Sequence, residues 1–311
     1  MALDLKNCSP SKTITYKSYN KIKDDEVKLY KLKKITKQNL INTKRILLYN
    51  VATDIKVYRL SSKLVPLVTH PDVINWDYQE SFKEIYGQIS NIIKDNNLRI
   101  SMHPDHFTLI SSPRYDVVES SIKILSYHNN IMSSMGVESA SGKLVLHIGG
   151  KYKSKEKTKD RFIKNFKLLD RDIKERIILE NDDKTYDIFD VLEICEELNI
   201  PMVLDVHHQW CNNRNENLIN YIDRIFKTWE NHKLKPKIHI SSPKTEKKFR
   251  AHNDYIDSDS FISFSQEIKS INKDFDVMIE AKKKNLALFK LMNDIKVKNK
   301  FKIIDKASLK V

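Results

Sequence analysis

Short hydrophobic runs, most of them rich in β-branched residues, recur along the chain and are bounded by polar segments. Runs of this length and composition are typical of strands that are buried on both faces of a sheet. The pattern predicts seven strands, at Val57–Leu60, Arg99–Met102, Leu144–Ile148, Ile177–Leu179, Met202–Val206, Lys237–Ile240 and Val277–Ile279.

Between these runs, hydrophobic residues repeat at three- and four-residue steps, which is the period of a helix that buries one face. The segment Ile188–Leu198 has this period, and Pro201 follows where a helix must already have ended. The segments Phe162–Ile173 and Val118–Met132 have it too, and Gly136 suits the C-terminal cap of the second. Strands that alternate with helices predict a parallel sheet covered by helices.

The strand count bears on how this sheet closes, because a closed (β/α)8 barrel needs eight strands. A helix around Gln38–Val51 precedes the first predicted strand, and the start of the chain, MALDLKNCSP, is short, polar and closed by Pro10. We therefore predict a TIM-type α/β barrel that is incomplete at its first strand. A doubly wound sheet is the alternative, although the sequence lacks the glycine-rich first turn that is common in such sheets.

No linker divides the sequence, which has only 5 Gly and 8 Pro. We predict that residues 1–311 form a single α/β-barrel domain, with a short basic C-terminal extension from about residue 295. Three scattered cysteines argue against a disulfide framework. The start has no signal peptide and no apolar stretch is long enough to span a membrane, so we expect a cytoplasmic monomer without membrane contacts.

The net charge of the chain indicates what kind of partner it binds. Lys and Arg total 55 and Asp and Glu 41, which gives a formal charge of +14. A polyanion such as nucleic acid would be attracted and held by this excess. An AT-rich genome, which raises the Lys and Asn content, explains the charge equally well when the charge is taken alone.

The residues that follow the predicted strands indicate the chemistry, because active sites of barrels lie at the C-terminal ends of the strands. Among the ten histidines, only His128 and His232 look like ordinary helix-surface residues. Six of the seven strands end in His, Asp or Glu, namely His103 with His106, His147, Glu180, Asp205 with His207 and His208, His239, and Glu280.

Any one of these histidines alone is more often a hydrogen-bonded structural group than a ligand. Together they would bury several charges without partners, at several kcal/mol per group, unless a cation compensates. Imidazole and carboxylate without thiolate favour Mn²⁺, Zn²⁺ or Co²⁺ over Mg²⁺ or Ca²⁺. The carboxylates Glu180, Asp205 and Glu280, with at least five histidines, are too many for one ion. We predict two or three ions bridged by Glu180 and Asp205, a cluster that suits phosphodiester hydrolysis.

Lys237 shares a strand face with His239 and would point at this cluster. A protonated amine is unfavourable beside cations. The side chain is therefore neutral and acts near the scissile phosphate, or is carboxylated to a carbamate, or reaches a DNA phosphate as a simple cation. The sequence leaves these three alternatives open.

At this point a family resemblance adds to the interpretation of single residues. The motifs RLSS, VPLVTHPD, HPDHFTLISSP, LVLHIGG, ILENDDKTY, LDVHHQW, KPKIHISSPK, AHNDYI and MIEAKKKNLAL resemble, in this order, those of the UV damage endonuclease family. The resemblance runs from about Ser9 to Asp294. It implies a TIM barrel related to endonuclease IV. It also implies a DNA repair enzyme that uses Mn²⁺ or similar ions to nick damaged double-stranded DNA 5′ to UV photoproducts (cyclobutane dimers and 6-4 photoproducts) and to abasic sites.

The resemblance implies roles for single residues. It makes Glu180, Lys237 and His70 catalytic, with Lys237 matching a lysine that can be carboxylated and His70 a histidine close to the scissile phosphate. His106 and Phe107 match the loop that enters the DNA beside the lesion, where the family usually has Gln followed by Tyr or Phe. Eight positions match metal ligands: His103, His147, Glu180, Asp205, His208, His239, His252 and Glu280.

The chain departs from the family at its start. Aligned on SPSKT, it begins after the family's first strand, which carries lesion-recognising residues, and this is the strand that the strand count also lacks. Two other functions therefore stay in view. One is a metal-dependent sugar isomerase or epimerase on a related barrel, which the many histidines and the charge disfavour. The other is a catalytically impaired DNA-binding relative, which the complete set of ligands disfavours.

Overall fold

The centre of the protein is a parallel sheet, seen in a computed structural model that describes residues 2–232 and 234–311. Its strand order is β1-β2-β3-β4-β5-β6-β9, so each strand pairs with the next along the barrel. All seven predicted strands are confirmed, with bounds that differ by at most two residues. They are β1 (Val57–Leu60), β2 (Arg99–Met102), β3 (Lys143–Leu146), β4 (Ile177–Glu180), β5 (Met202–Asp205), β6 (Lys237–Ile240) and β9 (Asp276–Ile279).

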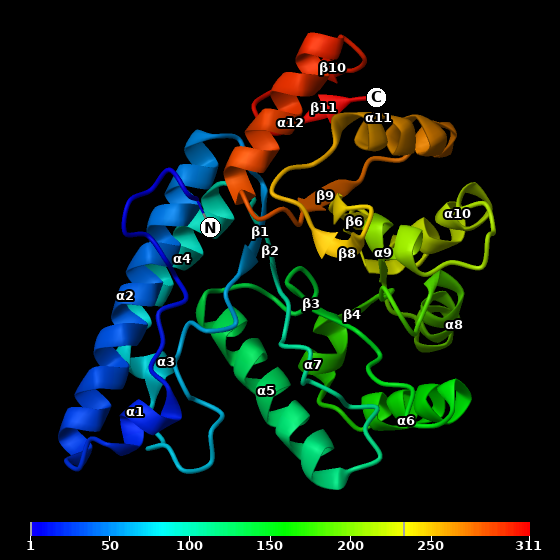
Figure 1. The fold of residues 1–311 in the computed structure, drawn as a ribbon. Helices are drawn as coiled ribbons and strands as arrows, with labels where there is room; N and C mark the ends of the chain where they lie inside the picture. The colour runs from blue at the N-terminus through cyan, green and yellow to red at the C-terminus, as the bar shows by residue number, and fades with distance from the viewer. Residues whose placement is uncertain (1, 233) are drawn as a thin grey trace.

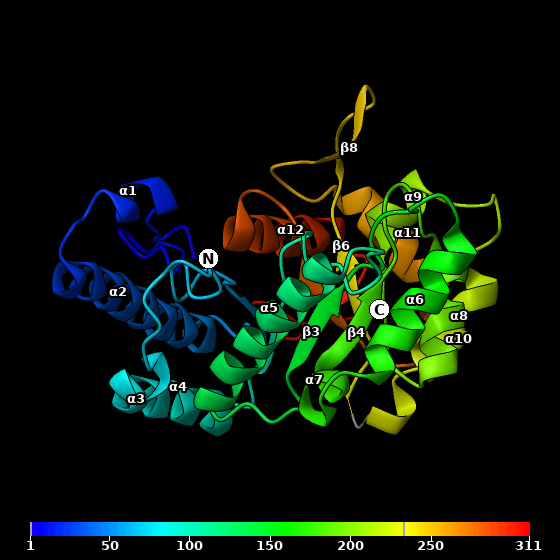
Figure 2. The same ribbon diagram turned by 90° about the horizontal axis from the view of Figure 1, so that it is seen from below.

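Helices surround this sheet and cover its outer face (Figures 1 and 2). The helical period of Ile188–Leu198 is confirmed in α8, and Gly136 follows α5 with a left-handed φ of 66°. The period at Phe162–Ile173 is divided between two helices. The helices are α1 (Tyr16–Asn20), α2 (Asp25–Ala52), α3 (Tyr78–Ser81), α4 (Lys83–Asp95), α5 (Tyr115–Ser134), α6 (Lys155–Lys167), α7 (Arg171–Arg176), α8 (Ile188–Leu198), α9 (Val206–Cys211), α10 (Ile219–Lys227), α11 (Ser258–Glu267) and α12 (Lys284–Lys298), with 3-10 turns η1 (Glu230–His232) and η2 (Ile268–Ile271).

The inner face of the sheet carries a small apolar cluster. Val145, Ile178 and Val203 are fully buried and pack with Trp229, separately from the main core. Side chains alternate between the two faces of a strand, so Ile178 and Glu180 share the inner face of β4, as Val203 and Asp205 do in β5. The cluster therefore lies one layer below the acidic residues at the strand ends.

The sheet is nearly closed but has an unsealed seam. β1 and β9 are its two edges and face each other, yet no backbone pairing joins them within the described residues. Two ion pairs cross this region: Arg59 in β1 contacts Glu280, and Nη1 of Arg99 in β2 lies 2.5 Å from Oδ2 of Asp276 in β9. The prediction of an incomplete TIM-type barrel is confirmed.

Two short antiparallel hairpins were not predicted. β7 (Pro243–Thr245) pairs with β8 (Lys248–His252), and β10 (Lys302–Ile303) pairs with β11 (Leu309–Lys310). Phe301, Ile303 and Leu309 pack against the main core, so the basic C-terminal segment is attached to the body of the protein.

The expectation that His128 lies on a helix surface is wrong. Its side chain is only 2% exposed, and Nδ1 lies 2.7 Å from the carbonyl oxygen of Ile124. His128 shares one face of α5 with the buried Leu125 and Met132, at helical spacing. This spacing is the signal in the sequence that could have indicated a core position for His128. No described helix is long and apolar enough to cross a membrane.

Candidate metal centre

Glu180, the last residue of β4, is the centre of the site. Its side chain is 1% exposed and belongs to three groups of residues whose potential ligand atoms lie within 4.8 Å of one another. Seven of the eight expected ligands are thus brought together at the C-terminal ends of the strands. The groups are His103, His147 and Glu180; Glu180, Asp205 and His208; and Glu180, His239 and Glu280.

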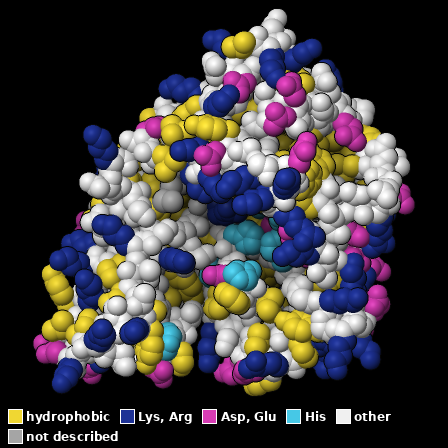
Figure 3. All heavy atoms as spheres, in the orientation of Figure 1, with side chains coloured by type: hydrophobic (Ala, Val, Ile, Leu, Met, Phe, Trp, Pro, Cys, Tyr) yellow, Lys and Arg dark blue, Asp and Glu magenta, His cyan; other side chains and the backbone are white. Residues whose placement is uncertain are grey.

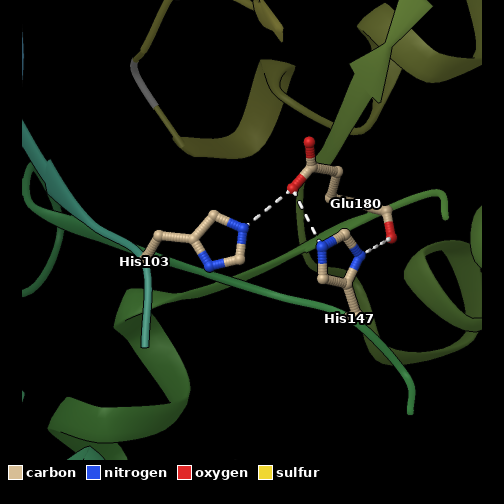
Figure 4. A group of neighbouring side chains, drawn as sticks. All are labelled: His103, His147 and Glu180. Carbon is tan, nitrogen blue, oxygen red and sulfur yellow. Dashed lines mark hydrogen bonds and ion pairs between the residues drawn. The ribbon is translucent and has the colours of Figure 1, made fainter. Parts of the chain in front are cut away.

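Histidines approach both oxygens of the Glu180 carboxylate. Nδ1 of His239 lies 2.7 Å from Oε1, and Nε2 of His103 lies 3.1 Å from Oε2. Figure 4 shows the rings of His103 and His147 pointing at the same oxygen, with Nε2 of His147 3.6 Å away. Burial opposes ionisation of Glu180, but the adjacent His239 and His103 hold its pKa well below the usual range. The carboxylate is therefore charged and available to a cation.

The first turn of α9 places Asp205 next to His208. Asp205 caps this helix, and its Oδ1 accepts a hydrogen bond of 2.8 Å from the backbone N–H of His208. Nδ1 of His208 lies 2.8 Å from the carbonyl oxygen of Asn181, which fixes the orientation of the ring. Asn181 also exchanges two hydrogen bonds with the backbone of Asp205. Sequence reasoning missed this positioning residue, although it directly follows Glu180 in the motif ILEND.

Two buried atoms test whether the residues suit a metal ion. Oδ2 of Asp205 and Nε2 of His239 belong to fully buried side chains, and neither atom has a hydrogen-bond partner within the described residues. Leaving such groups unpaired is costly. Burial also raises the pKa of Asp205 well above its ordinary value. Asp205 and His239 belong to different groups of potential ligands, so separate divalent cations would satisfy them. A mixed nitrogen and oxygen donor set fits a transition metal such as Mn²⁺ or Zn²⁺.

Glu280 and His208 show how charge is distributed across the site. Burial opposes ionisation of Glu280, yet Arg59 and His239 lower its pKa to about 2. Burial also opposes protonation of His208, yet Asp205 and Glu180 raise its pKa to about 8. Glu280 is therefore ionised, and the carboxylates beside His208 attract positive charge to that part of the site.

The remaining expected residues lie around this centre. His252 belongs to none of the three groups, but its Nδ1 is 3.9 Å from Oε2 of Glu280. His70 also belongs to none, and its ring stacks on that of Tyr16 with the centroids 4.0 Å apart. Its role at the scissile phosphate stays a prediction.

Lys237 lies on the inner face of β6 and is 1% exposed. Its Nζ has no hydrogen-bond partner within the described residues. Burial and then the charge of Arg99 lower its pKa well below the ordinary value. These surroundings favour a neutral amine or a carbamate over a cation that reaches a DNA phosphate.

His106 and Phe107 are exposed at the rim, with 76% of the His106 side chain and 67% of Phe107 accessible. Their rings lie 4.0 Å apart. His106 lines a pocket together with His103, His147 and Asp183. Figure 3 shows histidines in the hollow of this face, bordered by Lys and Arg side chains.

The chain is similar to known proteins over nearly its whole length. The model of the family described as UV-endonuclease UvdE matches residues 1–310. The UV DNA damage endonuclease of Bacillus mycoides (strain KBAB4) is 44% identical over 308 residues, which cover 99% of this chain and 96% of that protein. The crystal structure of SacUVDE matches with a TM-score of 0.83 at 33% identity, covering 94% of this chain and 95% of that one. Endonuclease IV from Thermus thermophilus shares the fold alone, with a TM-score of 0.53 at 12% identity over 82% and 94% of the two chains.

Proposed function

This chain belongs to the UV-endonuclease UvdE family, and on that premise we propose that it nicks damaged double-stranded DNA 5′ to UV photoproducts. Cyclobutane dimers and 6-4 photoproducts are the proposed lesions, with abasic sites as further substrates. We propose that the protein acts as a monomer, since a single chain supplies the three groups of potential metal ligands. We also propose that it acts in the cytoplasm.

The observation that carries this proposal is the position of Glu180, a buried carboxylate shared by three groups of metal-binding residues. We propose that these groups hold two or three divalent ions, with Mn²⁺ as the first candidate. When bound, such ions neutralise charge on the phosphate and lower the pKa of a water nucleophile. A site of this kind suits hydrolysis of a phosphodiester.

Residues of the chain position the proposed metal ligands and contact the DNA. Asn181 fixes Asp205 and His208 through its side chain and its carbonyl oxygen. A neutral or carboxylated Lys237 and His70 are the proposed catalytic partners of Glu180 at the phosphate. His106 and Phe107 are exposed and planar, so they can fill the space that a flipped-out lesion leaves in the base stack.

The direct test is cleavage of an end-labelled duplex that contains one cyclobutane pyrimidine dimer, first with Mn²⁺ and then with EDTA. We expect a nick immediately 5′ to the dimer that leaves a 3′-hydroxyl and a 5′-phosphate, and we expect EDTA to abolish it. Absence of a nick with folded, metal-loaded protein would contradict the proposal.

A substitution at the shared carboxylate tests the metal assignment. We expect Glu180→Gln to bind fewer ions per chain and to bind duplex DNA nearly as wild type does. We also expect cleavage by this variant to be about 10³-fold slower or more, because loss of a metal ligand removes several kcal/mol of transition-state stabilisation. Elemental analysis, anisotropy and single-turnover cleavage measure the three quantities. The exposed Glu26→Gln is the matched control, and normal cleavage by Glu180→Gln would refute the assignment.

A further inference from the structure

The strands β7 and β8 form a hairpin that projects from the body of the protein (Figure 2). Residues 243–252, here called the basic hairpin, begin with Pro243 paired to His252 and turn after Thr245, which pairs with Lys248. Every residue from 244 to 250 is exposed. This protrusion has no part in the core, so its conformation and charge need another explanation.

The basic hairpin carries concentrated positive charge. It contains four basic residues and one acidic residue, Glu246, which leaves three net positive charges. Within the described residues, no carboxylate forms an ion pair with Lys244, Lys247 or Lys248. Elsewhere on the surface, lysines such as Lys235 are paired with a neighbouring carboxylate. The charge of the hairpin is therefore free to attract an anion.

A buried histidine fixes the base of the basic hairpin. Nε2 of His207 lies 2.7 Å from the carbonyl oxygen of Phe249 and donates to it, while Nδ1 accepts from Oγ of Ser241 at 2.5 Å. The Phe249 ring packs edge-on against the His207 ring. Asn253 donates to the carbonyl oxygen of Pro243. Because His207 lies between Asp205 and His208, the same segment holds the hairpin and the candidate metal ligands.

The basic face of the hairpin leads to the metal centre. Lys248, Arg250 and His252 alternate along β8, so they share one face at steps of about 6.8 Å. His252 ends this row, with Nδ1 2.9 Å from the carbonyl oxygen of Glu280. Nε of Arg250 lies 3.7 Å from Oδ2 of Asp183, a residue of the pocket beside His103. A row of basic side chains, Lys248 and Arg250, thus leads outward along β8 from His252 at the candidate metal centre.

We propose that the basic hairpin binds the phosphate backbone of the duplex beside the bond that is cut and positions the duplex over the barrel mouth. The inference rests on the proposed function for the identity of the nucleic acid. Contacts with phosphates fix the position of a protein on a duplex without reading sequence. The hairpin therefore acts on damaged and undamaged DNA alike, unlike the lesion-contacting role proposed for His106 and Phe107. Its fixed base reduces the ordering that binding requires.

The test uses the full chain with the three unpaired lysines replaced, K244Q/K247Q/K248Q. Binding to fluorescent duplexes with and without one cyclobutane dimer is followed by anisotropy in EDTA, at salt concentrations from about 50 to 200 mM. The slope of log K against log salt is negative, and each lost phosphate contact makes it less steep by about 0.9, so we expect it to become less steep by up to about 2.7. The change is expected on both duplexes. The variant K244R/K247R/K248R retains the three positive charges and is expected to keep the wild-type slope.

The control removes the same charge at the opposite rim. Three exposed lysines lie on the segments that lead into strands at this rim: Lys56 directly before β1, Lys94 in the last turn of α4 before β2, and Lys269 in η2 before β9. We expect K56Q/K94Q/K269Q to keep the wild-type slope, because its effect is limited to net charge. Thermal unfolding of both variants checks that the fold is retained.

The outcomes separate the two proposals. Equal slopes for the hairpin variant and the control overturn the hairpin proposal, as does a loss confined to damaged DNA or a wild-type protein that binds no duplex. A wild-type protein that binds duplex with a steep slope lost in the hairpin variant, yet nicks no lesion, contradicts the proposed function and supports the hairpin proposal.

Discussion

Histidine side chains in this protein have different roles because their burial and their partners differ. His239 is fully buried against Glu180 and has one free nitrogen within the described residues. His207 is equally buried, but both of its nitrogens are engaged by Ser241 and Phe249. The first is available to a metal ion and the second supports a loop. The two residues are of the same type and equally buried, so their hydrogen-bond partners determine the different roles of His239 and His207.

His128 provides a prediction at this scale. Burial lowers its pKa to about 4, so the folded state resists protonation more than the unfolded state, whose histidine pKa is about 6.5. Its contribution to the free energy of unfolding is complete above pH 6.5 and is lost as the pH falls toward 4, by about 3 kcal/mol. We expect His128→Leu to flatten this part of the stability profile, measured by urea unfolding between these pH values. Identical profiles for both proteins would contradict the assignment.

At the scale of elements, strands and amphipathic helices were predictable because hydrophobic periodicity encodes them locally. The basic hairpin was not predictable, since β8 has the sequence KFRAH and its residues are exposed or half-buried. No apolar face distinguishes such a strand from a polar loop. The strands β10 and β11 have two residues each, which is too short to show a period. The hairpin is held by His207, which is 42 residues away from its partner Phe249, and by Asn253, which lies just outside β8 and contacts Pro243.

The N-terminus of α8 gives a prediction at this scale, because this helix follows the loop that begins after Glu180. Asp187 caps α8 by accepting from the backbone N–H groups of Phe189 and Asp190, and it also pairs with Arg214. We expect Asp187→Ala to lower the free energy of unfolding by about 1–2 kcal/mol, mainly through loss of the cap. Asp187→Asn keeps a capping oxygen and is expected to cost less. Equal losses in denaturant unfolding would argue against the cap as the cause.

At the scale of the whole molecule, the seam between β9 and β1 distinguishes this barrel from a closed one. Backbone hydrogen bonds join all the neighbouring strands in the order from β1 to β9. Between β9 and β1, ion pairs of side chains cross the seam instead. Arg99 is the more buried of the two arginines, and its guanidinium also lies over the ring of Trp229. The contact between β2 and β9 thus links the seam to the inner apolar cluster.

Removing one partner of this pair tests its contribution. Burial lowers the pKa of the Arg99 guanidinium while Asp276 opposes that shift, so Asp276→Asn would leave a poorly solvated charge. We expect a loss of about 3 kcal/mol in the free energy of unfolding. The double variant R99M/D276L removes both charges and should lie closer to wild type. A single variant as stable as the wild type, in the same urea titration, would show that solvent already screens the pair.

The sequence by itself determined the strands, the helices between them and the rim at which His103, Glu180, Asp205 and Glu280 meet. These features follow from local periodicity and from the geometry of parallel strands, whose C-terminal ends lie at one edge. Only the tertiary structure decided that Lys237 is enclosed and that the basic hairpin projects from the body of the protein, with its base at His207 and His252. Burial and hydrogen bonding depend on partners far away in the chain, as for His239 and Glu180, which are 59 residues apart. Sequence spacing alone carries no information about such partners.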